Sequence, residues 1–315
     1  MNRPAAALFA SLALFGCDEL NPADEGASGG EDELALFSVA PDVGACAAGA
    51  LTPEYQARIV QRVNQIRLHH ELPPVAISQG RAPAAQAAAL VAVANAKLSH
   101  SPSPGAFCYS AEAAEASSES LLFLSAGNQV GNVRDPDRFL GDWLRDANVA
   151  SLGHRRWLLD PFVAEVAFGF VQGEPKVDFP YSPVVGAALH VVDDQDTDLS
   201  WWPNDFVAYP FGLYPAGFVD RDWLFSFSVV ADKSQRLGSA NKVSFASATV
   251  EVKDESGAAL AVSGVSGAYD LIGLPNVLTW RADGVAHGEL YTVRVGGVSV
   301  DGVARDFEYE FLLVP

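Results

Sequence analysis

Four residues in the first half of the chain have side chains that bind metal ions or exchange protons: His100, Glu119, Asp146 and His154. Small, Pro or Gly residues lie beside each of them, which is typical of loops and element ends. Two imidazoles and two carboxylates can converge on a divalent cation or form an acid–base cluster. Their separations of 19, 27 and 8 positions are a signature of neither. A structural role in hydrogen bonding is therefore the competing interpretation.

No motif for a specific reaction accompanies these residues. The sequence contains no His-Glu-x-x-His, no Gly-x-Ser-x-Gly, no phosphate-binding Gly-rich loop and no cysteine cluster. Arg155 and Arg156 follow His154, and we expect one of them to form a structural ion pair with Asp160 or Asp146. The other histidines are expected in structural positions: His69, His70, His190 and His287. Without a recognisable nucleophile, the residues favour binding over catalysis.

Helices and strands alternate in the part of the chain that carries the four candidates. Thr52 is suited to cap a helix that begins at Pro53. Its apolar residues fall on one face: Tyr55, Ile59, Val63 and Ile66. Further helices are predicted over 82–98, which is rich in Ala, and 136–147, and strands over 163–171 and 184–192. We expect helices packed on a sheet.

In the second half of the chain the apolar residues recur with the period of strands and no longer with that of helices. From Trp201 onward apolar and polar residues alternate, as in 223–228, 249–252 and 307–311, which predicts strands with one solvated face. Asp301-Gly302 predicts a hairpin turn. These features predict an immunoglobulin-like β-sandwich. The aromatic and proline residues between 201 and 215 are expected to pack at the domain interface, with carbohydrate or lipid stacking as the alternative.

The sequence segments around the four candidates resemble those of the CAP superfamily, which includes cysteine-rich secretory proteins, venom antigens and plant pathogenesis-related proteins. The resemblance covers roughly 52–194 and is most specific in Gly-His-Arg-Arg-Trp-Leu-Leu-Asp-Pro, residues 153–161. It implies a three-layer α-β-α sandwich with two His and two acidic residues in a central cleft. By position, His100 and His154 match the two histidines, and Glu119 matches the glutamate of the Glu-Asn motif.

Two of these positions depart from the family pattern. Ser120 replaces the usual Asn, and Asp146 replaces the second Glu with a shorter side chain. Residues 147–152 are an insertion before Gly153-His154 relative to small bacterial members. Because neutral imidazole nitrogens bind Zn²⁺ and similar ions, His100 and His154 are the predicted metal ligands, and zinc or another divalent cation is the predicted cofactor.

The N-terminus predicts export. One positive charge, Arg3, precedes an uncharged stretch from Ala5 to Gly16 that is typical of a signal peptide and too short to span a membrane. Leu-Phe-Gly-Cys, ending at Cys17, resembles a bacterial lipobox, so Cys17 is the predicted lipidation site; an ordinary secretory signal is the alternative. Residues 18–44 contain no Lys or Arg and predict an acidic tether. Cys46 and Cys108 are the predicted disulfide pair in an oxidising compartment, with two free buried thiols as the alternative.

Charge limits the partners. The formal net charge is −19. Nucleic acid needs a basic patch and is not an expected partner. The expected partners are a membrane, through the lipid anchor, and a small apolar, glycan or protein ligand.

These observations combine into one prediction of organisation and function. The fold class is α+β, and the domains are a signal peptide over 1–16, the lipidated cysteine and tether over 17–50, a CAP-like domain over 51–195 and an all-β immunoglobulin-like sandwich over 196–315. The predicted protein is extracytoplasmic and membrane-anchored, and it binds a divalent metal or a small apolar or envelope ligand. The alternatives are a metal-dependent hydrolase of peptide or envelope polymer, with Glu119 as general base, and an adhesion or scaffolding protein without a ligand site.

Overall fold

A four-stranded sheet forms the centre of the first half of the protein. The structure, a computed structural model, describes residues 35–127, 136–147, 149–192, 198–219 and 224–315. The strand order is β3-β5-β6-β4. The strands are β3 (Ala76–Ile77), β4 (Ser120–Ala126), β5 (Glu165–Gly173) and β6 (Val184–His190). Strand β6 pairs antiparallel with both β5 and β4, and is buried along its whole length.

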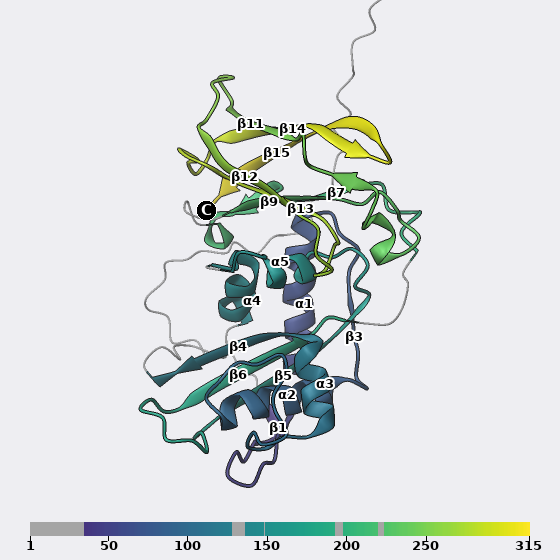
Figure 1. Ribbon diagram of the computed structural model, residues 1–315. Helices are drawn as coiled ribbons and strands as arrows, with labels where there is room; N and C mark the ends of the chain where they lie inside the picture. The colour runs from purple at the N-terminus through teal and green to yellow at the C-terminus, as the bar shows by residue number, and fades with distance from the viewer. Residues whose placement is uncertain (1–34, 128–135, 148, 193–197, 220–223) are drawn as a thin grey trace, which may run out of the picture. The chain divides into compact units, whose positions relative to one another are not determined.

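Helices cover both faces of this sheet (Figure 1). On one face lie α2 (Ala82–Ala94) and α3 (Ala111–Ser118). On the other lie α1 (Pro53–His69), α4 (Pro136–Arg145) and α5 (Gly153–Leu158). Two separate apolar clusters fill the two spaces: Leu122 and Val171 pack against α2, whereas Leu121 and Phe170 pack in the cluster that contains α1 and α4 residues. The predicted three-layer α-β-α arrangement is confirmed.

Local sequence explains where the helices begin. The Oγ1 of Thr52 accepts a hydrogen bond from the Tyr55 amide at 3.2 Å, so α1 starts at Pro53 as predicted. The small residues of α2 allow close approach to the sheet. A Cβ at Gly169 of β5 would lie 2.2 Å from the Ala85 carbonyl group, so only Gly fits there.

Two predicted helices are shorter than expected, and several elements of this half were missed. Helix α2 ends at Ala94 rather than at residue 98, because Asn95 caps it and Ala96 takes a positive φ of 44°. Helix α4 ends at Arg145, before the predicted end at 147. The missed elements include α3 and β4, which flank Glu119, and α5, which carries His154.

The second half consists of β-strands in two sheets. One sheet has the order β12-β13-β9-β7, and the other β10-β14-β15-β8 with β11 paired to β14. The strands of the first are β7 (Phe206–Tyr209), β9 (Phe225–Val229), β12 (Val262–Ala268) and β13 (Val277–Ala282). Those of the second are β8 (Gly212–Pro215), β10 (Val243–Ser244), β11 (Thr249–Asp254), β14 (Leu290–Val300) and β15 (Val303–Val314). Two 3-10 turns, η2 (Ala216–Phe218) and η3 (Arg236–Ser239), complete this half.

Aromatic side chains from the two sheets meet in the core of this half. The ring of Phe227 lies 5.2 Å from that of Phe307, and the ring of Phe225 lies 5.6 Å from that of Phe311. Asp301 and Gly302 both have positive φ and form the turn between β14 and β15, as their sequence predicts. This half is therefore a β-rich region with the sandwich packing expected from the sequence.

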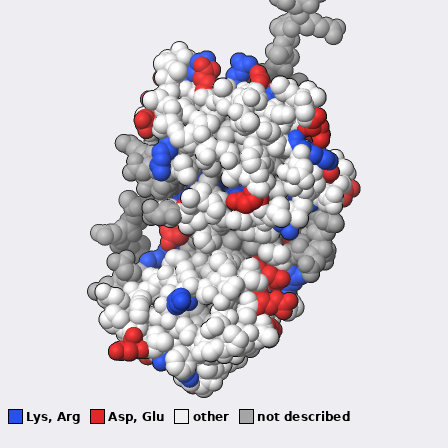
Figure 2. Space-filling view, in the orientation of Figure 1, with Lys and Arg blue, Asp and Glu red and all other residues white. Residues whose placement is uncertain are grey.

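Charged side chains are dispersed over the face shown in Figure 2, where Lys and Arg lie apart from one another and uncharged residues dominate. Residues 35–315 form one compact unit. The predicted boundary at 195/196 falls in that unit and remains a prediction. Among the described residues no helix is both long and apolar enough to cross a membrane.

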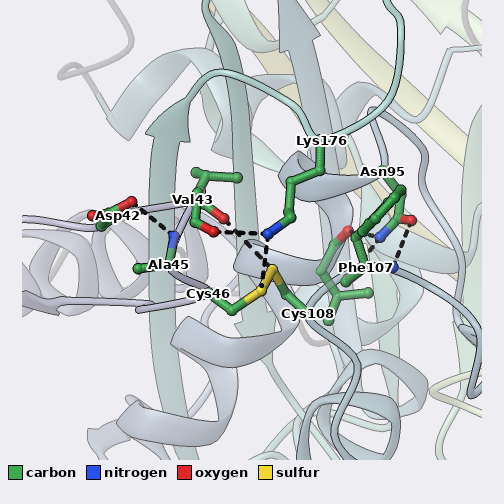
Figure 3. The surroundings of a disulfide bond; sticks show 10 residues. Asp42, Val43, Ala45, Cys46, Asn95, Phe107, Cys108 and Lys176 are labelled. Carbon is green, nitrogen blue, oxygen red and sulfur yellow. Dashed lines mark hydrogen bonds between the residues drawn. A yellow bond between two sulfur atoms is a disulfide. The ribbon is translucent and has the colours of Figure 1, made fainter.

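A disulfide joins the start of the described chain to the layer formed by α2 and α3. Strands β1 (Phe37–Val39) and β2 (Ala50–Leu51) flank the loop that carries Cys46, whose sulfur is bonded to that of Cys108 (Figure 3). Lys176 donates from Nζ to the Gly44 carbonyl at 2.7 Å and lies beside this bridge. The sequence separation of 62 corresponds to about 4 kcal/mol of stabilisation on the chain-entropy model.

Candidate functional site

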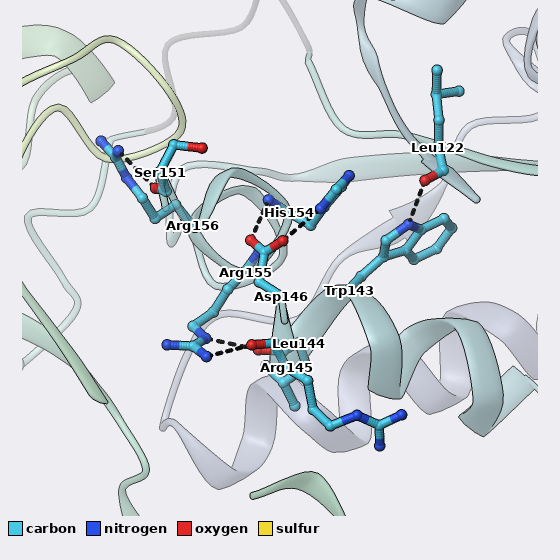
Figure 4. Close-up of polar contacts among 9 residues, drawn as sticks. All are labelled: Leu122, Trp143, Leu144, Arg145, Asp146, Ser151, His154, Arg155 and Arg156. Carbon is cyan, nitrogen blue, oxygen red and sulfur yellow. Dashed lines mark hydrogen bonds and ion pairs between the residues drawn. The ribbon is translucent and has the colours of Figure 1, made fainter. Parts of the chain in front are cut away.

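Asp146 and His154 form a direct pair at the junction of α4 and α5. Asp146 follows the last residue of α4 and has a φ of 55°, which turns the chain sharply. Its Oδ1 accepts a hydrogen bond from Nδ1 of His154 at 2.7 Å. Its Oδ2 accepts from the backbone amides of His154, at 2.9 Å, and Arg155, at 3.2 Å. The carboxylate therefore caps the start of α5 and orients the histidine ring (Figure 4).

This pairing determines which ring nitrogen of His154 is available. A carboxylate can only accept, so Nδ1 carries the hydrogen and neutral His154 has a lone pair on Nε2. The side chain of Asp146 is fully buried, whereas that of His154 is 24% exposed. The pair thus presents an imidazole nitrogen, backed by a buried carboxylate, to whatever approaches.

The guanidinium group of Arg155 holds the C-terminal end of α4. Its Nε donates to the Leu144 carbonyl and its Nη2 to the Arg145 carbonyl, both at 2.7 Å. These are carbonyl groups of the last turn of α4, which have no partner within the helix. A cation at this helix end is favourable, and here it also holds the residue that precedes Asp146.

Glu119 belongs to a second pair, with His190. Glu119 caps the C-terminus of α3 and precedes β4, and its carbonyl accepts from the amides of Val191 and Val192. Its Oε2 accepts from Nε2 of His190 at 2.9 Å. His190 is paired with Ser120 in the β4–β6 register, so strand pairing brings the two side chains together. In this pair the imidazole is buried, at 4% exposure, and the carboxylate is 34% exposed.

A guanidinium group lies against the buried imidazole. Arg81, at the N-cap of α2, donates from Nη1 to the Val192 carbonyl at 2.6 Å. The same nitrogen lies 3.4 Å from Nδ1 of His190. It is also 3.5 Å from Nε2, so the guanidinium lies against the ring that bonds Glu119.

His100 is exposed and lies at the C-terminus of α3. Its Nδ1 is 2.9 Å from the Ser117 carbonyl, two residues before Glu119. The structure therefore places His100 and Glu119 around one helix end, and Asp146 with His154 at another.

This arrangement bears on the predicted metal. Within the described residues no group of three or more His, Cys, Asp or Glu side chains is placed to hold a metal ion. A site using all four side chains as ligands does not fit, because both oxygens of Asp146 already accept hydrogen bonds. His154 by itself keeps a nitrogen that can ligate a cation, since Nδ1 is bonded to Asp146 and Nε2 is the remaining nitrogen. A carboxylate behind a ligating histidine is a common supporting arrangement.

His190 lies in a structural position, as expected, but sequence reasoning missed that it pairs with Glu119. Its signal was present: it is the one polar side chain between Val184 and Val192. A buried ionisable group in an apolar strand needs a hydrogen-bonding partner. One of the two arginines forms an ion pair, as predicted, but with a different partner. Arg156 pairs with Asp270 of the β-rich half, and not with Asp160 or Asp146.

Comparison with known families places these residues in context. Residues 60–184 match the cysteine-rich secretory protein family, CAP. The match includes Glu119, Asp146 and His154, and it ends before His190. No curated protein matches the chain.

Proposed function

We propose that this chain, which contains a CAP domain followed by a β-rich C-terminal region, is an exported and envelope-anchored binding protein whose ligand contacts His154. The ligand is a divalent cation or a small apolar or envelope-derived molecule. One observation carries the proposal: the buried Asp146 carboxylate holds Nδ1 of His154 and leaves Nε2 on a partly exposed ring. Such an imidazole accepts a hydrogen bond or coordinates a cation.

For a cation, His154 and His100 are the proposed imidazole ligands, with Asp146 in a supporting role. Asp146 makes His154 a better ligand, because the carboxylate on Nδ1 fixes the tautomer and the orientation of the ring. For an uncharged ligand, the same ring offers an acceptor, and the exposed carboxylate of Glu119 offers a second. Neither use requires a nucleophile.

The experiment is a titration of purified, untagged protein with Zn²⁺ by calorimetry, together with screening of lipid and glycan ligands by ring NMR of His154. His154→Ala is expected to abolish binding. His287→Ala, at an exposed turn of the β-rich half, is the matched control and is expected to bind as the wild type does. If wild type takes up no cation, lipid or glycan, the proposal is wrong.

The anchor is a separate part of the proposal. CAP-family proteins are commonly extracellular, which agrees with the predicted export signal. Cys17 and residues 18–34 of the predicted tether lie outside the described residues, whereas residues 35–50 lie within them and contain β1, the start of β2 and Cys46. Mass spectrometry of the mature N-terminus is expected to find a diacylated Cys17; an unmodified Cys17 or cleavage elsewhere would leave a secreted protein with the same CAP domain.

A second function, hydrolysis, is favoured by the same pair. A histidine whose Nδ1 is held by a buried carboxylate is suited to ligate a metal ion, and the partly exposed carboxylate of Glu119 is then the candidate general base. Turnover of peptide or ester substrates that is lost with chelator and in Glu119→Ala would establish the metal-dependent hydrolase. A change confined to melting temperature in His154→Ala would instead favour a scaffolding protein.

A further inference from the structure

Helix α5, which carries His154, is held by the β-rich half through two consecutive arginines. The first, Arg155, donates from Nη1 to the Leu224 carbonyl at 2.6 Å and lies 3.4 Å from Oγ of Ser226 in β9. Its guanidinium also stacks over the ring of Tyr209, 3.8 Å from the ring centre. Arg155 is only 1% exposed. The same guanidinium holds the last carbonyl groups of α4, so one side chain joins β9 to both sides of the Asp146 turn.

The second arginine contacts a different segment. Arg156 forms an ion pair with Asp270, in the loop between β12 and β13, and donates to the Leu274 carbonyl at 2.6 Å. Gly273 of that loop has a φ of 58°, and a Cβ there would lie 2.7 Å from the Arg156 carbonyl group. The backbone of the loop therefore lies directly against the backbone of α5.

A third contact completes this attachment. Arg236 of η3 lies over the ring of Trp157, 4.7 Å from its centre. Three successive residues of α5, all immediately after His154, thus meet three separate segments of the β-rich half. Helix α5 has six residues and little stability of its own.

The Asp146 carboxylate is bonded to the same helix that the two arginines hold. Oδ2 of Asp146 accepts hydrogen bonds from the amides of His154 and Arg155, at the start of α5. A rotation or shift of α5 would lengthen these bonds and the bond to Nδ1 of His154 together. The position of the ring therefore depends on where the β-rich half holds the helix.

We infer that the β-rich half is a positioning element of the His154 site, with Arg155 and Arg156 as positioning residues and Asp270 and Ser226 as their partners in that half. This inference rests on the proposed function of His154 as the ligand-binding group. It assigns the second half of the chain a task in binding: a ligand at Nε2 and the α5 contacts stabilise one another, as linkage requires.

The test uses the full chain. It weakens the contacts of Arg155 and Arg156 by substitutions in the β-rich half, so that α5 itself is unchanged. Asp270→Ala removes the partner of Arg156, and Ser226→Ala removes a partner of Arg155. Three quantities are measured: the ring ¹⁵N shifts of His154 at a pH where it is neutral, hydrogen exchange of the His154 and Arg155 amides, and Zn²⁺ affinity. In Asp270→Ala we expect mixed tautomers at His154, amide exchange about tenfold faster at these two positions and affinity about tenfold lower. Asp270→Asn keeps an acceptor oxygen and should restore most of each.

Asp306→Ala is the matched control. It breaks an exposed ion pair with Arg294 in the same half and is expected to change none of the three quantities. If Asp270→Ala and Ser226→Ala leave the His154 ring and amides unchanged, the inference is wrong. It is equally wrong if all amides of the protein exchange faster by one common factor, since that indicates general destabilisation. Wild type without Zn²⁺ affinity would count against the proposed function, whereas the ring and amide measurements would still decide the positioning role.

Discussion

Two histidine–carboxylate pairs lie in the first half of the chain, and they are built in opposite ways. In Asp146–His154 the carboxylate is fully buried and the ring is 24% exposed. In Glu119–His190 the ring is 4% exposed and the carboxylate is 34% exposed. The first pair presents an imidazole and the second presents a carboxylate.

The difference shows which partner serves the other. A buried carboxylate with three hydrogen bonds is fixed, so Asp146 orients His154 and is itself unable to approach a ligand. His190 is fixed between Glu119 and Arg81 and in turn holds Glu119. The residues that reach outward are therefore His154 and Glu119, and the other two support them.

The comparison breaks first if Asp146 is not the fixed member of its pair. Asp146→Ala removes three hydrogen bonds to a buried carboxylate and leaves two amides at the start of α5 without an acceptor. We expect a loss of about 4 kcal/mol in the free energy of unfolding, measured with urea. Asp142→Ala, which removes the exposed partner of Arg145, is the control and should cost less than about 1 kcal/mol. Equal losses in the two variants would contradict the assignment.

A third imidazole sharpens the comparison, because its partners are uncharged. His70 is buried between the Ala208 carbonyl and the Tyr214 hydroxyl, at 2.8 and 3.1 Å. Burial lowers the pKa of His70 from 6.5 to about 3. On acidification the unfolded state therefore takes up the proton first. The stability contributed by neutral His70 is complete above pH 6.5 and is lost progressively as the pH falls toward 3.

The expected size follows from about 1.4 kcal/mol per pH unit. Between pH 7 and pH 4 the wild type should lose about 3 kcal/mol more unfolding free energy than His70→Gln, in urea titrations at each pH. His287→Gln, at an exposed turn, should follow the wild-type curve. Parallel curves for wild type and His70→Gln would show that His70 is protonated in the folded state at pH 4.

Local sequence predicted those elements whose start or turn it specifies. The cap at Thr52 and Pro53 located α1, and Asp301-Gly302 located the β14–β15 turn. Helix α3 was missed because it is short and carries no apolar stripe, although Ser110 caps it. Strand β4 follows it at once, without a Gly or Pro to mark the boundary.

The candidate residues of the site could be named from the sequence, but their pairing could not. Glu119 meets His190 because Ser120 and His190 are in register, a contact between positions 71 apart. Asp146 meets His154 because its φ is positive, which no residue type dictates. Arg156 of α5 pairs with Asp270, from the other half of the chain. Long-range packing decides each of these, and spacing along the chain does not encode it.

The second pair should respond less strongly than the first. Glu119→Gln keeps a hydrogen-bond acceptor for His190 but removes its charge, and the carboxylate is one-third exposed. We expect a loss of about 1 kcal/mol in unfolding free energy. Glu115→Gln, on the exposed side of α3, is the matched control and should be neutral. A loss as large as that of Asp146→Ala would mean that the two pairs are alike in their energetics.

The smallest expected effect on stability belongs to His154. It distinguishes the residue that holds the pair in place, Asp146, from the residue that contacts the ligand, His154. His154→Ala removes a partly exposed ring and one of three hydrogen bonds to Asp146, while the two amide donors remain. We expect a loss of about 1 kcal/mol or less in the free energy of unfolding, measured with urea, together with complete loss of ligand binding. Asp146→Ala should lose both. A His154→Ala variant as unstable as Asp146→Ala would show that the ring serves the carboxylate, and the direction of support within this pair would be reversed.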